Sequence, residues 1–284
     1  MKELQHFVPA CYLANYAFDG NKGREVHVHC MFVKDGKQNI KRVDDIALEN
    51  GFYDLKELGE ESRLIEDFYA NHIEPQLSSL LSKILKLVEI NPSSREKAYV
   101  ELDKEDRNAF SAQMAIQYTR TRDYRNRFEN SYNKMVEGFP WASIPKYGKK
   151  DFRRIHVMDL LELRSSNFFA NLFDDRHWIF LINHTKVPFI TSDNPLIQIN
   201  HHSEKEMGVS PASPQATMYF PLSPKVAIEV YHKSIAKDDL RYFDVYKKET
   251  VDWYNYNEIS HCTRVVISNM DFATMNYRED LHNE

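Results

Sequence analysis

The feature that most constrains the fold of this chain is that helix-like and strand-like hydrophobic patterns lie in different halves of it. Between residues 60 and 135 apolar side chains recur every three or four residues, as on a helix that buries one face. From 177 to 268, short runs rich in β-branched and aromatic residues alternate with turn residues. This segregation predicts an α+β fold, in which a mainly antiparallel C-terminal sheet packs against a layer of long helices.

Proline and capping residues set the expected limits of the helices. Residues 60–88 predict one long helix or a pair, which Pro75 bends or divides. A loop is expected at 91–96. A second helical stretch runs from Asp103, a candidate N-cap, to Met135, and a third covers 158–173. The segment 138–150, which contains two prolines and two glycines, is predicted to connect them.

The strand-like segments predict two β structures. Residues 24–33 alternate as in a half-buried strand, and Asp35-Gly36 predicts the turn of a small N-terminal hairpin. In the C-terminal half, strands are expected at 177–183, 187–191, 196–199, 217–220, 226–231 and 264–268, all in one antiparallel sheet. A helix is expected at 250–261, and a mobile loop at 200–215.

Composition indicates an ordinary globular protein. The 284 residues, 42% of them hydrophobic, can bury a sizeable core, and we expect a single domain over 1–284 with a helical layer at 60–135 and a sheet-rich part at 177–268. A net charge of −5 means that a nucleic-acid partner would need a local basic patch. Three cysteines without a CxxC pair, and no apolar run of about 18 residues, predict a cytoplasmic protein with no membrane association.

Four short motifs place polar or titratable side chains beside prolines and aromatic rings. They are His6-Phe-Val-Pro9 followed by Tyr12 to Tyr16, Gln117-Tyr-Thr-Arg120-Thr-Arg122, Phe189-Ile-Thr-Ser-Asp193-Asn-Pro195, and Phe220-Pro-Leu-Ser-Pro224. In this order they resemble the signature of the domain of unknown function 4238 family, from His6 to about Ser268. The usual family pattern has a proline where this chain has Arg122. The resemblance supports the boundaries and the choice of residues, and it implies no particular reaction.

The first and third motifs each offer a chemical and a structural interpretation. His6 has a side chain that titrates near neutrality, so it could serve as a general acid or base, or it could simply hydrogen-bond to the backbone. Asp193 and Asn194 precede Pro195, which predicts a stiff turn at a strand end. Asp193 could orient a histidine or a metal ion there, or form an Asx-turn that caps its own backbone.

The second motif is expected to lie on a helix. Helical spacing puts Gln113, Gln117, Arg120 and Tyr124 on one face. That face could be solvated. Alternatively, Arg120 could pair with Asp193 and fix the helix to the sheet. A third interpretation is that Gln117 and Arg120 hold a phosphate or carboxylate, which suits the planar guanidinium.

Metal sites have weaker support in the sequence. Asp67, Asn71 and Glu74 share a predicted helix face. This face could be a solvated acidic stripe. Together with Asp193 it could instead bind magnesium as a cofactor, because magnesium prefers oxygen ligands such as carboxylates. His27 with His29, and His201 with His202, lack a third ligand at zinc spacing. Ser223 lacks a nucleophile-elbow motif.

Nucleic-acid binding has one local signal. Arg120, Arg122, Arg125 and Arg127 are interleaved with Tyr118, Tyr124 and Phe128, a combination that could grip a backbone and stack bases, although Asp123 and Glu129 dilute the charge. No glycine-rich phosphate loop occurs.

These residues lead to three functional hypotheses. The first is a nuclease-like phosphoester hydrolase acting on RNA or DNA, conceivably an effector of prokaryotic conflict or phage defence. In it His6, Asp193 and Arg120 are catalytic, while Gln117, Asn194 and Arg122 bind substrate. One alternative is a non-catalytic ligand-sensing or protein-interaction module that uses the same residues. The other is a purely structural role, in which these residues only hold the N-terminal segment and the helical layer on the sheet. A shared site predicts that His6, Arg120 and Asp193 come within about 10 Å of one another.

Overall fold

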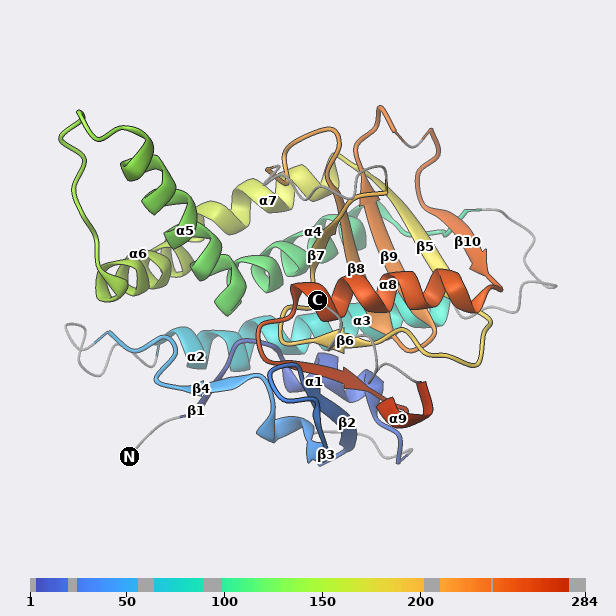
Figure 1. Ribbon diagram of the computed structural model, residues 1–284. Coiled ribbons are helices and arrows are strands. Elements are labelled where there is room, and N and C mark those ends of the chain that lie inside the picture. Colours follow the sequence, from blue (N-terminus) through green and yellow to red (C-terminus); the bar gives the residue numbers. More distant parts are fainter. Residues whose placement is uncertain are drawn as a thin grey trace.

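The computed structural model describes residues 4–19, 25–55, 64–88, 99–201, 210–235 and 237–275. It has the predicted α+β architecture: a long-helix layer packs against a C-terminal sheet, and a small β-hairpin lies near the N-terminus (Figure 1). The expected helix start at 60–63, the loop at 91–96, and half of the loop at 200–215 (residues 202–209, including His202) lie outside the described residues.

The N-terminal part contains short elements. They are β1 (Leu4–His6), α1 (Ala10–Leu13), a 3₁₀ turn (Ala14–Tyr16), β2 (His27–Phe32), β3 (Lys37–Arg42), a 3₁₀ turn (Val43–Asp45) and β4 (Leu48–Asn50). The predicted hairpin is confirmed as β2 and β3, and Gly36 in its turn has φ +62°, which glycine adopts without strain. A separate two-stranded sheet pairs β1 with β4, so that His6 lies opposite Leu48.

The helical layer begins with α2 (Leu64–Phe68), a π-helical turn (Tyr69–Ile73) and α3 (Glu74–Val88). The π turn ends directly before Glu74-Pro75, which confirms that Pro75 marks an interruption, because proline cannot donate to the carbonyl four residues earlier. The layer continues with α4 (Lys104–Thr119), α5 (Arg122–Gly138), α6 (Lys149–Glu162) and α7 (Arg164–Asp174). Asp103 caps α4, as predicted, by accepting a hydrogen bond from the Asp106 backbone at 2.8 Å.

Two expected helices are each divided in two. The stretch 103–135 breaks at Thr121, whose extended backbone (φ −79°, ψ 159°) and hydroxyl start α5, because the hydroxyl accepts a bond from the Tyr124 amide. The stretch around 158–173 breaks at Leu163, a residue in the left-handed region at φ 53°. Both breaks are local backbone events that hydrophobic spacing alone does not reveal.

The C-terminal half contains the predicted strands except the one expected at 187–191, of which only Thr191 lies in a strand, and they do not form one sheet. Its elements are β5 (His177–Asn183), β6 (Thr191–Ser192), β7 (Ile197–Ile199), β8 (Thr217–Ser223), β9 (Val226–Tyr231), β10 (Arg241–Val245), α8 (Lys248–His261), β11 (Val265–Ser268) and α9 (Phe272–Met275). One sheet has the order β10-β5-β9-β8-β7 and another the order β3-β2-β11-β6. The prediction of a single sheet was therefore wrong: β6 and β11 join the N-terminal hairpin, and β10 pairs in parallel with β5.

Side-chain alternation explains how the five-stranded sheet is covered on both faces. In β9, Val226, Ile228 and Val230 face the main core with α4 and α7, whereas Ala227 faces a second apolar cluster with Val251 and Tyr254 of α8. Figure 1 shows α8 crossing in front of this sheet. The sheet therefore lies between the helical layer and α8.

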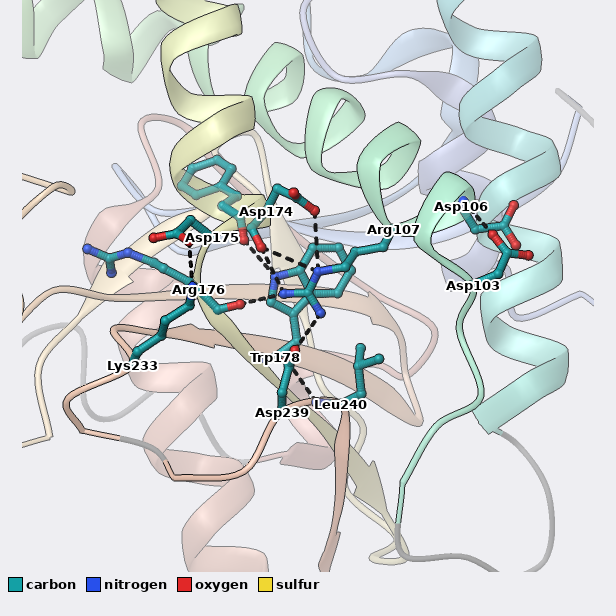
Figure 2. A network of polar contacts seen from close by, with 11 residues as sticks. Asp103, Asp106, Arg107, Asp174, Asp175, Arg176, Trp178, Lys233, Asp239 and Leu240 are labelled. Atoms are coloured by element: carbon teal, nitrogen blue, oxygen red, sulfur yellow. Dashed lines mark hydrogen bonds and ion pairs between the residues drawn. The ribbon is translucent and has the colours of Figure 1, made fainter.

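A largely buried arginine, with its side chain 12% exposed, fixes the helical layer to the sheet. Arg107 of α4 forms ion pairs with Asp174 at the end of α7 (3.3 Å) and with Asp239 before β10 (2.9 Å), and its guanidinium lies 4.5 Å from the centre of the Trp178 ring. Figure 2 shows Arg107 between these two carboxylates and over the indole. Asp239 also accepts a bond from the Trp178 amide at 2.8 Å. The side chain of Arg107 thus links α4, α7, β5 and the segment before β10.

Helices α5 and α6 form a projecting hairpin, which we call the arm (residues 122–162). In Figure 1 it extends away from the sheets, with the connecting segment 139–148 at its outer end. No residue of α5 is fully buried, in contrast to α4. The predicted connector at 138–150 is therefore the outer tip of this arm.

Candidate functional site

The N-terminal segment is held by the second motif, from α4. Arg120 is 1% exposed, donates from Nη2 to the His6 carbonyl at 2.7 Å and from Nε to the Tyr53 hydroxyl at 3.3 Å, and pairs with Glu74 at 3.5 Å. Gln117 Nε2 donates to the Phe7 carbonyl at 3.2 Å. The first two motifs are therefore in direct contact, as predicted for His6 and Arg120. The donors of Arg120 face the backbone and side chains of the protein.

Tyr12 joins the first motif to the third and fourth. Its hydroxyl lies 2.7 Å from Thr191 Oγ1 and donates to the Pro221 carbonyl. Nearby, Asn15 Nδ2 donates to the Leu222 carbonyl at 3.3 Å. Burial raises the pKa of Tyr12 well above its usual value, so the hydroxyl keeps its proton and remains a donor.

Asp193 is fully buried directly after β6, at the strand end where it was predicted. Its carboxylate accepts bonds from Thr263 N (2.9 Å), Thr263 Oγ1 (2.6 Å) and Arg264 N (3.2 Å), and it pairs with Arg264 Nε at 3.5 Å. The Asx-turn interpretation was wrong, because the carboxylate caps the start of β11 and not its own backbone. The proposed Arg120–Asp193 pair is also replaced, since each residue has another partner.

Arg264 links Asp193 to the N-terminal segment. Its Nη2 donates to the carbonyl of Leu48, the residue opposite His6, at 3.2 Å, and its guanidinium lies 5.3 Å from the centre of the Phe7 ring. All four motifs therefore meet along the N-terminal segment 6–15. Asp193 reaches this junction only through Arg264.

The remaining site residues of the motifs are likewise engaged. His6 is half-buried and its Nε2 donates to the Asp44 carbonyl at 3.1 Å; desolvation lowers its pKa, so the imidazole is neutral at pH 7. Asn194 is buried and donates to the His261 carbonyl at 3.0 Å. Arg122 pairs with Glu49 of β4. The catalytic and substrate-binding roles of these residues stay predictions.

The two polar helix faces differ from each other. Gln113 and Gln117 are buried, so the solvated interpretation of that face was wrong, and Tyr124 belongs to α5 instead. Asp67 and Asn71 are exposed and line a mostly apolar cavity of about 570 Å³ between α2, the π turn and α6, whereas Glu74 turns inward to Arg120. No group of three or more possible metal ligands occurs within the residues that the structure describes.

The basic cluster of the sequence is paired internally. Arg125 donates to His156 Nδ1 at 3.1 Å and to the Phe52 carbonyl at 3.0 Å, and lies over the Phe52 ring. Arg127 pairs with Asp123. Together with the Arg122–Glu49 pair, the Arg127–Asp123 pair compensates two of the three arginines of α5, whereas Arg125 binds uncharged acceptors.

A separate acid–base cluster lies on the face of the five-stranded sheet that α8 covers. Glu229 of β9 is 2% exposed, and its carboxylate is 2.7 Å from Nε2 of His201. Tyr231 donates to Glu229 Oε2, and Tyr254 donates to Oε1 at 2.9 Å. Because a carboxylate only accepts, Nε2 carries the proton that is donated to Glu229. Nδ1 has no hydrogen-bond partner among the described residues.

This histidine differs from others that pair with acids. His201 is exposed, lies nearly parallel to the ring of Trp253 at 4.9 Å, and is bonded to a carboxylate whose side chain is only 3% exposed. In the pairs His27–Asp19 and His184–Asp244 the carboxylates are 18% and 27% exposed. A buried carboxylate that fixes one imidazole nitrogen while the other is free is the arrangement that orients a general base.

A family model described as a protein of unknown function, DUF4238, matches residues 4–272. The chain belongs to this family. The match includes all four motifs that meet along the N-terminal segment 6–15, so the resemblance found in the sequence is confirmed. Comparisons with curated proteins and with solved structures found no match. Within the described part of this DUF4238 chain, no helix has both the length and the apolar character needed to cross a membrane.

Sequence reasoning missed the residues that complete these contacts. Tyr53 and Arg264 lie outside the four motifs, and nothing in their local sequence marks them. For Glu229 a signal did exist, since it is the one charged residue within the apolar strand Val226–Tyr231. A charged side chain at a buried strand position needs a partner, and such a position is a candidate site.

Proposed function

We propose that this protein is a hydrolase, of the nuclease-like phosphoester class, in which His201 held by Glu229 is the general base. The observation that carries this proposal is the 2.7 Å contact between an exposed imidazole and a buried carboxylate. Relative to the sequence-based hypothesis, the reaction class is kept and the base is reassigned. The residues Arg120 and Asp193 then act as positioning residues, because their polar groups hold other parts of the chain.

The proposed reaction uses Nδ1 of His201, the ring nitrogen that has no partner among the described residues. Nδ1 takes a proton from a water molecule as the water oxygen bonds to phosphorus and the bond from phosphorus to the leaving oxygen breaks. The imidazolium then returns this proton to the leaving oxygen. Glu229 keeps the ring in one orientation and stabilises its charged form, while Tyr231 and Tyr254 hold the carboxylate in place.

The alternative to a hydrolase is a purely structural role of the motif residues, without chemistry. The observation that favours it is the burial of Gln117, Arg120, Asp193 and Asn194, whose bonds are made within the protein. Under this proposal the motifs stabilise the fold, and His201–Glu229 is only a satisfied polar pair. A role as an effector in phage defence stays a prediction from the sequence.

The test is incubation of the purified protein with single-stranded and duplex RNA and DNA, with magnesium, with manganese, and with a chelator. We expect cleavage of at least one substrate, and a rate about 100-fold or more lower for His201→Gln and Glu229→Gln. The matched control is His184→Gln, which alters a half-exposed histidine–carboxylate pair elsewhere on the sheet and should leave the rate unchanged.

Two results would contradict the hydrolase proposal. One is the absence of cleavage under every metal condition. The other is cleavage that His201→Gln leaves intact, which would move the reaction to another site. The chelator separates a metal-dependent reaction from one that uses the side chains alone.

A further inference from the structure

The outer end of the arm combines exposed aromatic rings with unpaired positive charge. Its exposed large apolar side chains are Met135, Phe139, Trp141 and Tyr147, and Trp141 is 81% exposed. Three of these four are aromatic. An indole this open to water on a soluble protein normally serves a contact with another molecule.

The charge at this tip is strongly one-sided. Residues 135–154 contain five basic residues against two acidic ones, in a chain whose net charge is −5. The basic residues are Lys146, Lys149, Lys150, Arg153 and Arg154. Of the acids, Asp151 is already bound to the Gly148 amide at 2.8 Å. The three lysines are exposed and form no ion pair with any described residue, unlike the arginines at the base of α5.

The rings are held in place before any partner binds. Phe139 and Trp141 contact edge to face at 5.7 Å, and the Ala142 amide donates to the Phe139 carbonyl at 3.0 Å. Tyr132 lies 5.1 Å from Tyr147 and donates to the Pro145 carbonyl at 2.9 Å. A preformed platform of this kind costs little conformational entropy on binding.

We infer that the tip of the arm, residues 135–154, is a binding surface for single-stranded nucleic acid. Exposed aromatic rings stack on bases whatever their sequence, and flanking lysines contact the phosphates. Bases in a duplex are already stacked, so single strands fit this surface better. An anionic membrane would also attract the lysines, but the exposed apolar side chains here are mainly flat rings, with no exposed leucine, isoleucine or valine among the large apolar side chains of this segment.

This inference goes beyond the proposed hydrolase, because it concerns the binding of a strand at the arm tip, which can be measured without any cleavage. The experiment is fluorescence anisotropy of labelled 20-nucleotide oligo-dT and oligo-U strands with the full chain, in the presence of chelator. Trp141→Ala should weaken binding about fivefold or more, as expected when one stacked base is lost. Lys149→Ala with Lys150→Ala should reduce the slope of log affinity against log salt by about 1.4, the value for two single-strand phosphates.

Two matched controls locate the effect on the tip. Phe168→Ala removes a 56% exposed ring on α7, and Lys34→Ala with Lys37→Ala removes two exposed lysines from the β2–β3 turn. Both should bind oligonucleotides like the unchanged protein. Three outcomes would overturn the inference: no binding to either strand, equal weakening by the control variants, or binding only to vesicles that contain phosphatidylserine.

Discussion

One hydroxyl group, that of Tyr12, contacts two of the four motifs at once. It is buried and bonded to Thr191 Oγ1 and the Pro221 carbonyl. We expect Tyr12→Phe to lower the free energy of unfolding by about 1 to 3 kcal/mol, because the buried carbonyl loses its donor. Urea denaturation measures this. Tyr246→Phe, at a position 68% exposed, should change it by less than about 0.5 kcal/mol, and an equal effect of both variants would count against this role.

Glu258 is a buried acid beneath the third motif. Ser192 Oγ donates to its Oε1 at 2.8 Å, and burial raises its pKa well above 4.5, so the folded protein keeps it neutral. The unfolded chain loses this proton above about pH 4.5. Unfolding therefore releases a proton, and the contribution of Glu258 to stability falls as pH rises from there toward the raised folded pKa, by up to about 1.4 kcal/mol per pH unit.

Glu258→Gln removes this ionisation while keeping the shape of the side chain. We expect the stability of the variant relative to the unchanged protein to increase steadily between pH 5 and pH 8. Melting temperatures across this range measure the difference. A difference that is constant with pH would show that Glu258 does not titrate between the folded and unfolded states.

Among the elements, α5 shows what the family pattern means physically. Arg122 is the first residue of this helix, after the extended cap Thr121, and it stands where the resemblance noted in the sequence implies a proline. Proline is favoured at a first helical position, and an extended residue before it avoids a clash. We expect Arg122→Pro to change the free energy of unfolding by less than about 1 kcal/mol, because the half-exposed pair with Glu49 contributes little.

The matched control lies four residues further along the same helix. Asn126 is exposed, but proline there removes a hydrogen bond inside α5 and clashes with the preceding turn. Asn126→Pro should therefore cost about 3 kcal/mol or more. If chemical denaturation found Arg122→Pro equally harmful, α5 would not begin where the structure places it.

Elements with a strong local pattern were predicted well from the sequence, and their partners were not. The limits of β5 and β9 match the expected strands at 177–183 and 226–231. Their sheet partners depend on contacts between distant residues, which is why β11 was expected beside them and instead pairs with β2. β10 was missed because it is a parallel edge strand with one buried residue out of five, so it lacks a continuous apolar run.

The same limit applies to the candidate site. The contact of Arg120 with the His6 strand was anticipated, since both lie in rigid polar motifs. The link through Arg264 and the pairing of His201 with Glu229 were not, because each joins residues more than 25 positions apart in the sequence. The burial of a motif side chain decides whether it has a structural role or belongs to a functional site, and burial is a property of the packed molecule.

At the scale of the whole molecule, one apolar core includes residues from both ends of the described chain. It contains Phe7 and Val8 beside Val265 and Ile267, together with residues of α3, α4 and the five-stranded sheet. We expect the protein to unfold as a single domain, with one calorimetric transition whose calorimetric and van't Hoff enthalpies agree. Two separate transitions would divide the helical layer from the sheets and contradict this expectation.

The central claim is that the motif residues hold the fold together while His201 and Glu229 carry the chemistry. The most direct measurement is a thermal melt and a nuclease assay of Arg120→Ala and His201→Gln, side by side. We predict a clearly lower melting temperature for Arg120→Ala, because Glu74 and the His6 carbonyl lose a buried partner. For His201→Gln we predict an unchanged melting temperature and lost cleavage. An unchanged melt with lost cleavage for Arg120→Ala, together with full activity of His201→Gln, would contradict it.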